Sequence, residues 1–300
     1  MCGIVGLYLK NDKYESQLGA LFSPMLIAMT DRGPDSAGFA IYGDEVGDDW
    51  LKITLRHADI NYDWNALSEG IKHSLDAEVI WFKNDRVAVF KVQADEKAII
   101  AYLEQNASDA DILSTGKSIE ILKEVGLAQN ISDSFNLPAM KGTHIIGHTR
   151  MATESAVTMA GSHPFSTGED LCLVHNGSLS NHNGLREVLE DAGIKFKTEN
   201  DSEVAAGYFA HQLQTGKTLA EALDSALEDL DGFFTFAIGT KNGFAVMRDP
   251  IACKPAVIAE TDDYVAMASE YQALTTLPGI ENAKVWEPEA ATLYVWERNS

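Results

Sequence analysis

The chain begins Met1-Cys2-Gly3-Ile4-Val5-Gly6, which places a thiol beside the N-terminus and directly before an apolar run. Removal of Met1, which the small Cys2 side chain permits, would leave Cys2 with a free α-amine. An α-amine has a pKa of about 7.7–8.0, so a neutral fraction is available near physiological pH to accept the thiol proton. The segment therefore indicates a nucleophile that carries its own base, although a small buried cysteine at the start of a strand fits it equally well.

Four further motifs place polar residues beside glycines or at the ends of apolar runs. They are Asp31-Arg32-Gly33-Pro34-Asp35-Ser36-Ala37-Gly38, Gly147-His148-Thr149-Arg150-Met151-Ala152-Thr153, His175-Asn176-Gly177-Ser178-Leu179-Ser180-Asn181 and Asn200-Asp201-Ser202-Glu203. Together with the N-terminal segment, and in this order, they resemble the class II glutamine amidotransferases. The resemblance leaves out the stretch from Gly43 to Met140. It implies a four-layer αββα fold, that of the N-terminal-nucleophile hydrolases.

The resemblance also implies a reaction, the release of ammonia from L-glutamine. Cys2 is expected to attack the side-chain amide and form a thioester. The Asn176 side chain and the Gly177 N–H are expected to stabilise the oxyanion, and such a donor typically contributes ~3 kcal/mol to the transition state. Glycine suits position 177 because a Cβ would block close approach of the substrate.

The remaining motif residues are expected to bind the substrate. Arg150 ends an apolar run, where its guanidinium can bind the α-carboxylate of glutamine in a bidentate manner, although a surface salt bridge is the alternative. Asp201 is expected to bind the α-ammonium, and its position before a predicted helix also suits a helix cap. Arg32 is expected near the nucleophile, and Thr153 is expected to line the glutamine pocket.

The hydrophobic pattern predicts strands, then helices, then strands again, which favours an α+β fold of stacked layers. We expect one amidotransferase domain over residues 1–300, with an α+β insertion at about 43–140 that has its own minor core. Within the insertion, Asn84-Asp85 predicts a hairpin between Val79–Phe82 and Val87–Val92. Two further helices are expected, one at Ser118–Val125 and one near Tyr271–Leu277.

Composition narrows the classes of partner. The formal net charge is −22, from 45 acidic and 23 basic residues. This balance argues against nucleic acid and against an anionic membrane surface, which both require clustered Lys and Arg. No run approaches the ~20 apolar residues of a membrane span. The three scattered cysteines predict neither a disulfide framework nor a metal site, and a cytoplasmic location fits them best.

The acceptor of the ammonia is expected on separate synthase subunits, because the motifs extend to Lys254-Pro255 and leave no room for an acceptor domain. The segment from Ser114 to Gly126 resembles part of the stand-alone subunits related to glutamate synthase, such as that of N-methylglutamate synthase. This implies FMN and iron-sulfur clusters on partner subunits and no cofactor on this chain, whose cysteines are too few to ligate a four-cysteine cluster. An amphipathic helix that closes the insertion is the simpler interpretation of the segment.

Two other functions remain open from the sequence. One is a non-catalytic regulatory or glutamine-sensing subunit that keeps the fold. The other is an amide hydrolase with a different substrate, although Arg150 and Asp201 together favour a free amino acid. Whether Met1 is removed decides between catalysis and binding alone.

Overall fold

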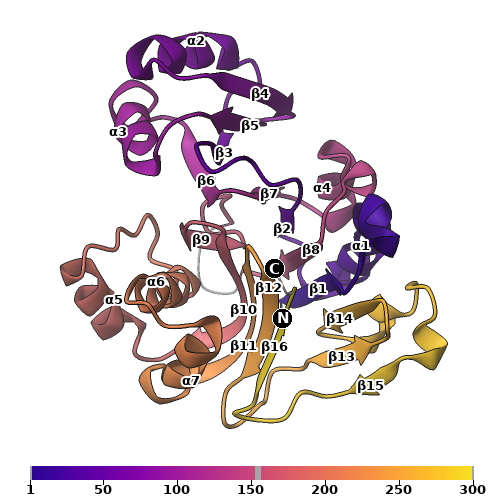
Figure 1. The fold of residues 1–300 in the computed structure, drawn as a ribbon. Helices are drawn as coiled ribbons and strands as arrows, with labels where there is room; N and C mark the ends of the chain where they lie inside the picture. Colours follow the sequence, from indigo (N-terminus) through magenta and orange to yellow (C-terminus); the bar gives the residue numbers. More distant parts are fainter. Residues whose placement is uncertain (1, 153–156, 299–300) are drawn as a thin grey trace.

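The computed structural model describes residues 2–152 and 157–298, in which the strands form three sheets (Figure 1). The largest has seven strands in the order β15-β13-β14-β1-β8-β2-β7, and its neighbouring strands pair in antiparallel register. In this order the strands are Lys284–Trp286, Val257–Glu260, Tyr264–Ala268, Gly3–Leu9, His144–Arg150, Ser36–Tyr42 and Ile119–Val125. The strand that follows Cys2 therefore lies in the middle of this sheet, beside the strand that ends at Arg150.

A second sheet has five strands in the order β16-β12-β11-β10-β9, again with antiparallel pairs. In this order the strands are Leu293–Glu297, Gly243–Arg248, Gly232–Thr240, Leu171–Leu179 and Phe165–Gly168. The helices around the two sheets are α1 (Leu18–Ala28), α4 (Ala128–Ser134), α5 (His182–Asp191), α6 (Asp201–Gln214) and α7 (Leu219–Asp229). The 3₁₀ helices are Asp12–Gln17, Thr30–Arg32, Leu137–Ala139, Tyr271–Leu274 and Ile280–Asn282.

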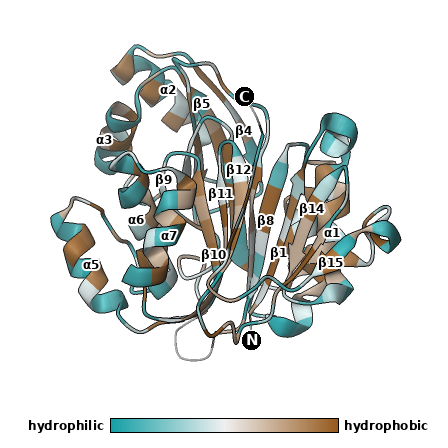
Figure 2. Ribbon diagram, turned by 60° about the horizontal axis from the view of Figure 1, so that its bottom comes forward, coloured by the Kyte–Doolittle hydropathy of each residue, from teal (hydrophilic) through white to brown (hydrophobic). Residues whose placement is uncertain are grey.

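Strand β10 shows why the layers stack, because successive side chains of a strand point to opposite faces of the sheet. Leu171 and Leu173 belong to the core that β10 shares with α5, α6 and α7. Cys172 and Val174 belong to the core that it shares with the seven-stranded sheet. The five-stranded sheet is therefore buried on both faces, and Figure 2 shows apolar strands of both sheets side by side between the helices.

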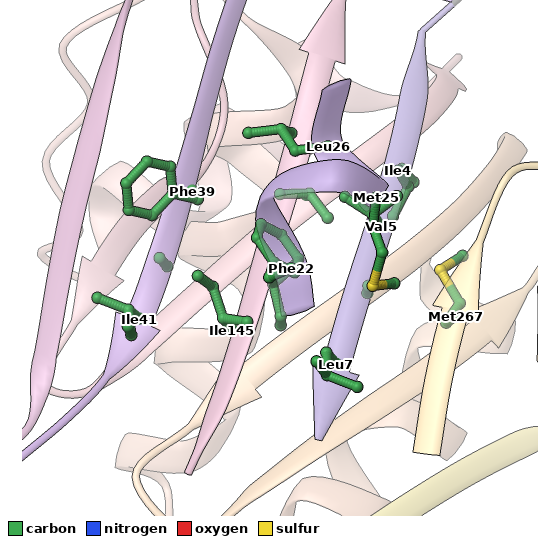
Figure 3. Packing of buried hydrophobic residues seen from close by; sticks show 14 of the residues in the cluster. Ile4, Val5, Leu7, Phe22, Met25, Leu26, Phe39, Ile41, Ile145 and Met267 are labelled. Carbon is green, nitrogen blue, oxygen red and sulfur yellow. The ribbon is translucent and has the colours of Figure 1, made fainter. Parts of the chain in front are cut away.

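Helix α1 covers the other face of the seven-stranded sheet. Phe22, Met25 and Leu26 of this helix are fully buried, and Figure 3 shows them over Val5 of β1 and Ile145 of β8. The order helix, sheet, sheet, helix confirms the predicted four-layer αββα fold.

The third sheet lies apart from these layers and has four strands in the order β4-β5-β3-β6 (Figure 1). These strands are Val79–Asn84, Val87–Val92, Leu51–Arg56 and Asp111–Gly116, and the helices beside them are α2 (Trp64–Leu75) and α3 (Glu96–Asn106). The predicted hairpin is present, with Asp85 in the left-handed conformation at φ 58°. A separate apolar cluster that includes Trp64 and Phe90 gives this part its own core.

The prediction of a helix at Ser118–Val125 is wrong. The segment forms strand β7, which pairs with β2 from Ile119 opposite Tyr42 to Val125 opposite Ser36. The spacing of Ile119, Leu122 and Val125 suits a helix. The alternation of Ile119, Ile121 and Lys123 suits a strand equally well, and hydrogen bonding to β2 decides in favour of the strand. Within the stretch predicted as an insertion, the chain thus returns to the large sheet. The helix expected near Tyr271–Leu277 is a 3₁₀ turn at Tyr271–Leu274.

Across the described ranges, we find no helix with the length and apolar character needed to cross a bilayer. Within the same ranges, no group of three or more His, Cys, Asp or Glu side chains is placed to hold a metal ion.

Candidate active site

The backbone of Cys2 is held by two side chains from distant parts of the chain. Arg32 Nε donates to Cys2 O over 3.0 Å, and Asn176 Nδ2 donates to the same oxygen over 3.2 Å. The Cys2 side chain is half-buried, and its Sγ lies 3.9 Å from Met151 O. Cys2, Arg32 and Asn176, which come from three of the motifs, are therefore in contact in the structure.

Arg32 is itself fixed by a carboxylate that the motifs did not indicate. Its Nη1 is 2.6 Å from Glu270 Oε1, and its own side chain is only 10% exposed. The neighbouring Ser269 holds the strand that follows the nucleophile, since its hydroxyl accepts from Ile4 N and its N–H donates to Ile4 O, both over 2.9 Å. The start of β1 is thus held by residues close to 270 as well as by Arg32.

Arg150 is the last residue of β8, and it is buried. The turn that follows is held by Asp35, whose N–H donates to Arg150 O over 3.1 Å and whose Oδ2 accepts from Ala152 N over 2.8 Å. Asp35 lies in one of the quoted motifs, but nothing in its sequence context indicated this contact. Thr153, predicted to line the pocket, falls outside the described residues.

Asn176 and Gly177 lie on β10 and come from the five-stranded sheet. Asn176 is buried, and Gly177 has a φ of 153°. A Cβ at position 177 would lie 1.7 Å from Phe233 O, so the backbone of β11 excludes any side chain there. The need for glycine at 177 thus comes from the neighbouring strand as well as from the expected approach of a substrate.

Asp201 is the first residue of α6, and its side chain is 21% exposed. Its Oδ2 accepts from Leu179 N over 2.9 Å, which ties the start of α6 to the end of β10. The helix cap is Asn200, whose side chain accepts from Ser202 N over 2.9 Å, so the capping role considered for Asp201 belongs to its neighbour. The other carboxylate oxygen, Oδ1, accepts from Ser202 Oγ over 3.3 Å, and the side chain of Asp201 remains partly exposed.

Buried histidines lie behind these residues. His175 precedes Asn176, and its Nδ1 is 2.8 Å from Ser202 Oγ and 3.8 Å from Asp201 Oδ1. The ring of His148 stacks on that of His163, with centroids 4.0 Å apart. Burial lowers the pKa of His148 to about 3 and lowers the pKa of His163 and His175 as well. These imidazoles are neutral near pH 7, and they act as packing and hydrogen-bonding groups.

Comparison with known proteins identifies the family of this chain. The family model described as a glutamine amidotransferase domain matches residues 148–276. The "Glutamine amidotransferase-like protein GlxB" of Rhizobium meliloti (strain 1021) is 54% identical over 297 residues, which cover 99% of this chain and 98% of that protein. The chain belongs to the glutamine amidotransferase family.

Other relatives of this amidotransferase are more distant. A "Putative glutamine amidotransferase" of Methanothermobacter thermautotrophicus is 34% identical over 311 residues, covering 98% of this chain and 99% of that one. The solved glutamine phosphoribosylpyrophosphate amidotransferase of B. subtilis is 20% identical with a TM-score of 0.63, and the match covers 99% of this chain and 47% of that chain. The fold is thus that of the class II, N-terminal-nucleophile amidotransferases.

Proposed function

We propose that this amidotransferase hydrolyses the side-chain amide of L-glutamine through a thioester on Cys2. The observation that carries the proposal is the 3.2 Å hydrogen bond from Asn176 Nδ2 to Cys2 O. This bond joins Asn176, the candidate oxyanion donor on the five-stranded sheet, to Cys2, the candidate nucleophile at the start of the seven-stranded sheet. An asparagine amide has two hydrogens, so one remains for the oxyanion.

The proposed reaction uses the α-amine that Cys2 would have after removal of Met1. This amine takes the thiol proton as Sγ bonds to the amide carbon, and the oxyanion accepts from Asn176 Nδ2 and the Gly177 N–H. As the C–N bond breaks, the α-ammonium returns the proton to the nitrogen, which leaves as ammonia. Water, deprotonated by the α-amine, then adds to the thioester, glutamate leaves, and the thiol is restored.

The substrate's charges are assigned to two residues, Arg150 at the end of β8 and Asp201 at the start of α6. Arg150 would bind the α-carboxylate and Asp201 the α-ammonium, with Thr153 lining the pocket. Arg32 would hold the Cys2 backbone against the substrate, which is consistent with its hydrogen bond to Cys2 O. This pairing of a cation with an anion favours a free amino acid over another amide.

The test compares ammonia and glutamate formation by the wild type, Cys2→Ala and Cys253→Ala. Cys253 is exposed, so it provides a matched control that changes a thiol elsewhere. We expect activity to be lost only in Cys2→Ala, and intact mass to show that Met1 has been removed. Equal activity in Cys2→Ala would exclude the mechanism. A processed, folded protein that binds glutamine without turnover would favour the regulatory or glutamine-sensing alternative.

We further propose that the ammonia is used on separate subunits of a glutamate-synthase-like complex, with N-methylglutamate synthase as one candidate. The support for this proposal is the segment from Ser114 to Gly126, which resembles part of the stand-alone subunits related to glutamate synthase. FMN and iron-sulfur clusters would then reside on the partners. Purification from the native host at natural abundance, with mass spectrometry of co-eluting chains, tests this. Recovery without a flavoprotein would exclude it.

A further inference from the structure

Strand β4 is the outermost strand of the third sheet, at the end of the sheet opposite β6 (Figure 1). It pairs with β5 along one edge in a single continuous register, from Val79 opposite Val92 to Asn84 opposite Val87. Within the part of the chain that the structure describes, no strand pairs with its other edge. That edge therefore presents backbone N–H and C=O groups that a further strand could use.

One hydrogen bond shows which backbone groups of β4 point outward. Gln93 N donates to Glu78 O over 2.9 Å, so these two residues form a hydrogen-bonded pair beside the β4–β5 ladder. Such pairs recur at every second residue of an antiparallel ladder, which assigns the even-numbered residues of β4 to β5. The N–H and C=O groups of Val79, Trp81 and Lys83 therefore point away from β5, toward the open edge.

The side chains of β4 alternate between a buried and an exposed face. Val79 and Trp81 pack against the apolar cluster of the third sheet. Ile80 and Phe82 point to the opposite face, where they are 60% and 45% exposed. A single exposed apolar residue is ordinary, but two neighbours on one face of an open edge mark a place where another strand can pair.

The usual means of protecting an edge strand are missing from β4. Proline, a bulge or a lysine that extends over the edge would block pairing. Residues 79–84 include no proline, and the register with β5 is regular. The lysine of this strand, Lys83, donates from Nζ to Ile60 O, so its ammonium is held by the chain's own backbone. Asn84 Nδ2 donates to Phe135 O over 2.8 Å, which ties the hairpin to the end of α4 and fixes the open edge in place.

The open edge is complementary to a second copy of itself. A two-fold axis through Trp81 aligns two β4 strands antiparallel, with Trp81 opposite Trp81 and Val79 opposite Lys83. All the outward-pointing groups then meet, because each opposed pair exchanges two hydrogen bonds. A shift by two residues in either direction would lose one of these pairs. On the exposed face, Ile80 of each copy lies opposite Phe82 of the other, at positions where Cα atoms approach to about 4.5 Å.

The charge around β4 also favours a second copy. The formal net charge of the chain is −22, and such a surface opposes self-association. The stretch 76–93 is an exception, because its acids Asp76, Glu78 and Asp85 are balanced by its bases Lys83, Arg86 and Lys91. Two copies can therefore meet at this neutral stretch without strong repulsion. A strongly basic or acidic partner would gain no electrostatic attraction from it.

We propose that β4 pairs with β4 of a second copy of this chain, so that the two four-stranded sheets become one continuous sheet. The contact is isologous, with the same surface used on both copies. It is smaller than a standard interface, so we expect a dissociation constant in the micromolar range. None of the residues assigned to the glutamine site lies on the third sheet, so the dimer does not depend on turnover at Cys2.

The first test measures the mass of the full-length chain by sedimentation from ~1 μM to ~1 mM and compares Lys83→Pro with Lys83→Ala. Proline is tolerated in an edge strand where the N–H points away from the sheet. It removes the Lys83 N–H from the contact, and Lys83→Ala removes the side chain alone. We expect a dimer for the wild type and Lys83→Ala, and a dissociation constant raised ~tenfold or more for Lys83→Pro. Thermal unfolding verifies that each variant is folded.

A second comparison tests the exposed face. Phe82→Lys should abolish the dimer, whereas Val188→Lys on α5 should not, since Val188 is 64% exposed and lies away from β4. A wild type that stays monomeric at all concentrations would overturn the proposal. Equal association of Lys83→Pro and Lys83→Ala, or a dimer that persists in Phe82→Lys, would also overturn it.

Oxidative cross-linking tests the register. With Cys253 replaced by Ser in both chains, a mixture of Ile80→Cys and Phe82→Cys should form a disulfide between positions 80 and 82, because directly opposed residues lie within disulfide range. Neither variant alone should form one between its own introduced cysteines. Mass spectrometry of the joined peptides identifies the link. Equal yields from a single variant and from the mixture would contradict the two-fold axis at Trp81.

Discussion

His148 Nε2 donates to His175 O over 3.0 Å, and this hydrogen bond joins the two central sheets directly behind the candidate active site. His148 lies two residues before Arg150 on β8, and His175 immediately precedes Asn176 on β10. The bond therefore sets the spacing between the residue assigned to the substrate carboxylate and the residue assigned to the oxyanion.

Replacing His148 with Ala should destabilise the protein and slow catalysis. The buried His175 carbonyl would lose its donor, which costs about 1–3 kcal/mol, and the missing ring would leave a cavity. Chemical denaturation and glutaminase assays measure both effects. His73→Ala on α2 is the control, since His73 is exposed. Stability and kcat equal to those of wild type would show that this hydrogen bond does not position the site.

Asn176→Ala should lower kcat by about 10²–10³ and change KM little, because an oxyanion donor acts mainly in the transition state. Steady-state glutaminase kinetics provide the measurement. Asn130 on α4 is exposed, so Asn130→Ala serves as the matched control. A kcat within a few-fold of wild type would remove Asn176 from the proposed oxyanion site.

Arg150→Ala and Asp201→Asn should chiefly weaken glutamine binding. Removing one partner of a desolvated charge pair costs ~2–5 kcal/mol, which corresponds to a KM raised by ~30-fold or more. The exposed Asp262 offers Asp262→Asn as a control for loss of an acidic charge. Unchanged KM in both site variants would count against the assigned roles.

Asp35 is predicted to position the turn after Arg150 through its carboxylate. Asp35→Ala removes the acceptor for Ala152 N and should raise KM for glutamine, whereas Asp35→Asn keeps an acceptor oxygen and should restore most of the affinity. Kinetics of the two variants, with thermal unfolding for comparison, separate positioning from general stability. If Asp35→Asn raises KM as much as Asp35→Ala does, the hydrogen bond from Ala152 N to residue 35 does not account for the affinity for glutamine.

The buried His144 should make stability depend on pH in the acid range. Burial lowers its pKa from the ordinary 6.5 to about 3, while Nε2 donates to Thr240 O over 2.9 Å. Between these values the unfolded chain binds more protons than the folded protein, so stability is full above the unfolded pKa and falls as the pH drops. His144→Gln should therefore lose less stability than wild type between about pH 7 and about pH 4. Parallel pH profiles would contradict this.

Local patterns were sufficient for many elements of the fold. The hairpin around Asn84-Asp85 and the strand after Cys2 were predictable, because turn chemistry and apolar runs act over a few residues. The motifs also named residues that meet in space: Cys2, Arg32 and Asn176. Their order along the chain indicated the family, and therefore the four layers.

Other features depended on contacts between distant segments. Ser118–Val125 has a pattern that suits a helix or a strand, and pairing with β2 decided it. Asp35 and Glu270 gave no local sign that they would hold the turn after Arg150 and the guanidinium of Arg32.

The sequence alone determined the chemistry available to this protein: an N-proximal thiol, an amide, a guanidinium and a carboxylate in a recognisable order. Tertiary structure decided which groups meet, because hydrogen bonds across the sheets join residues as far apart as Cys2 and Asn176. It also decided that β4 lies at the edge of its sheet with Ile80 and Phe82 exposed. Burial and distance follow from packing, and no periodicity within a single segment encodes them.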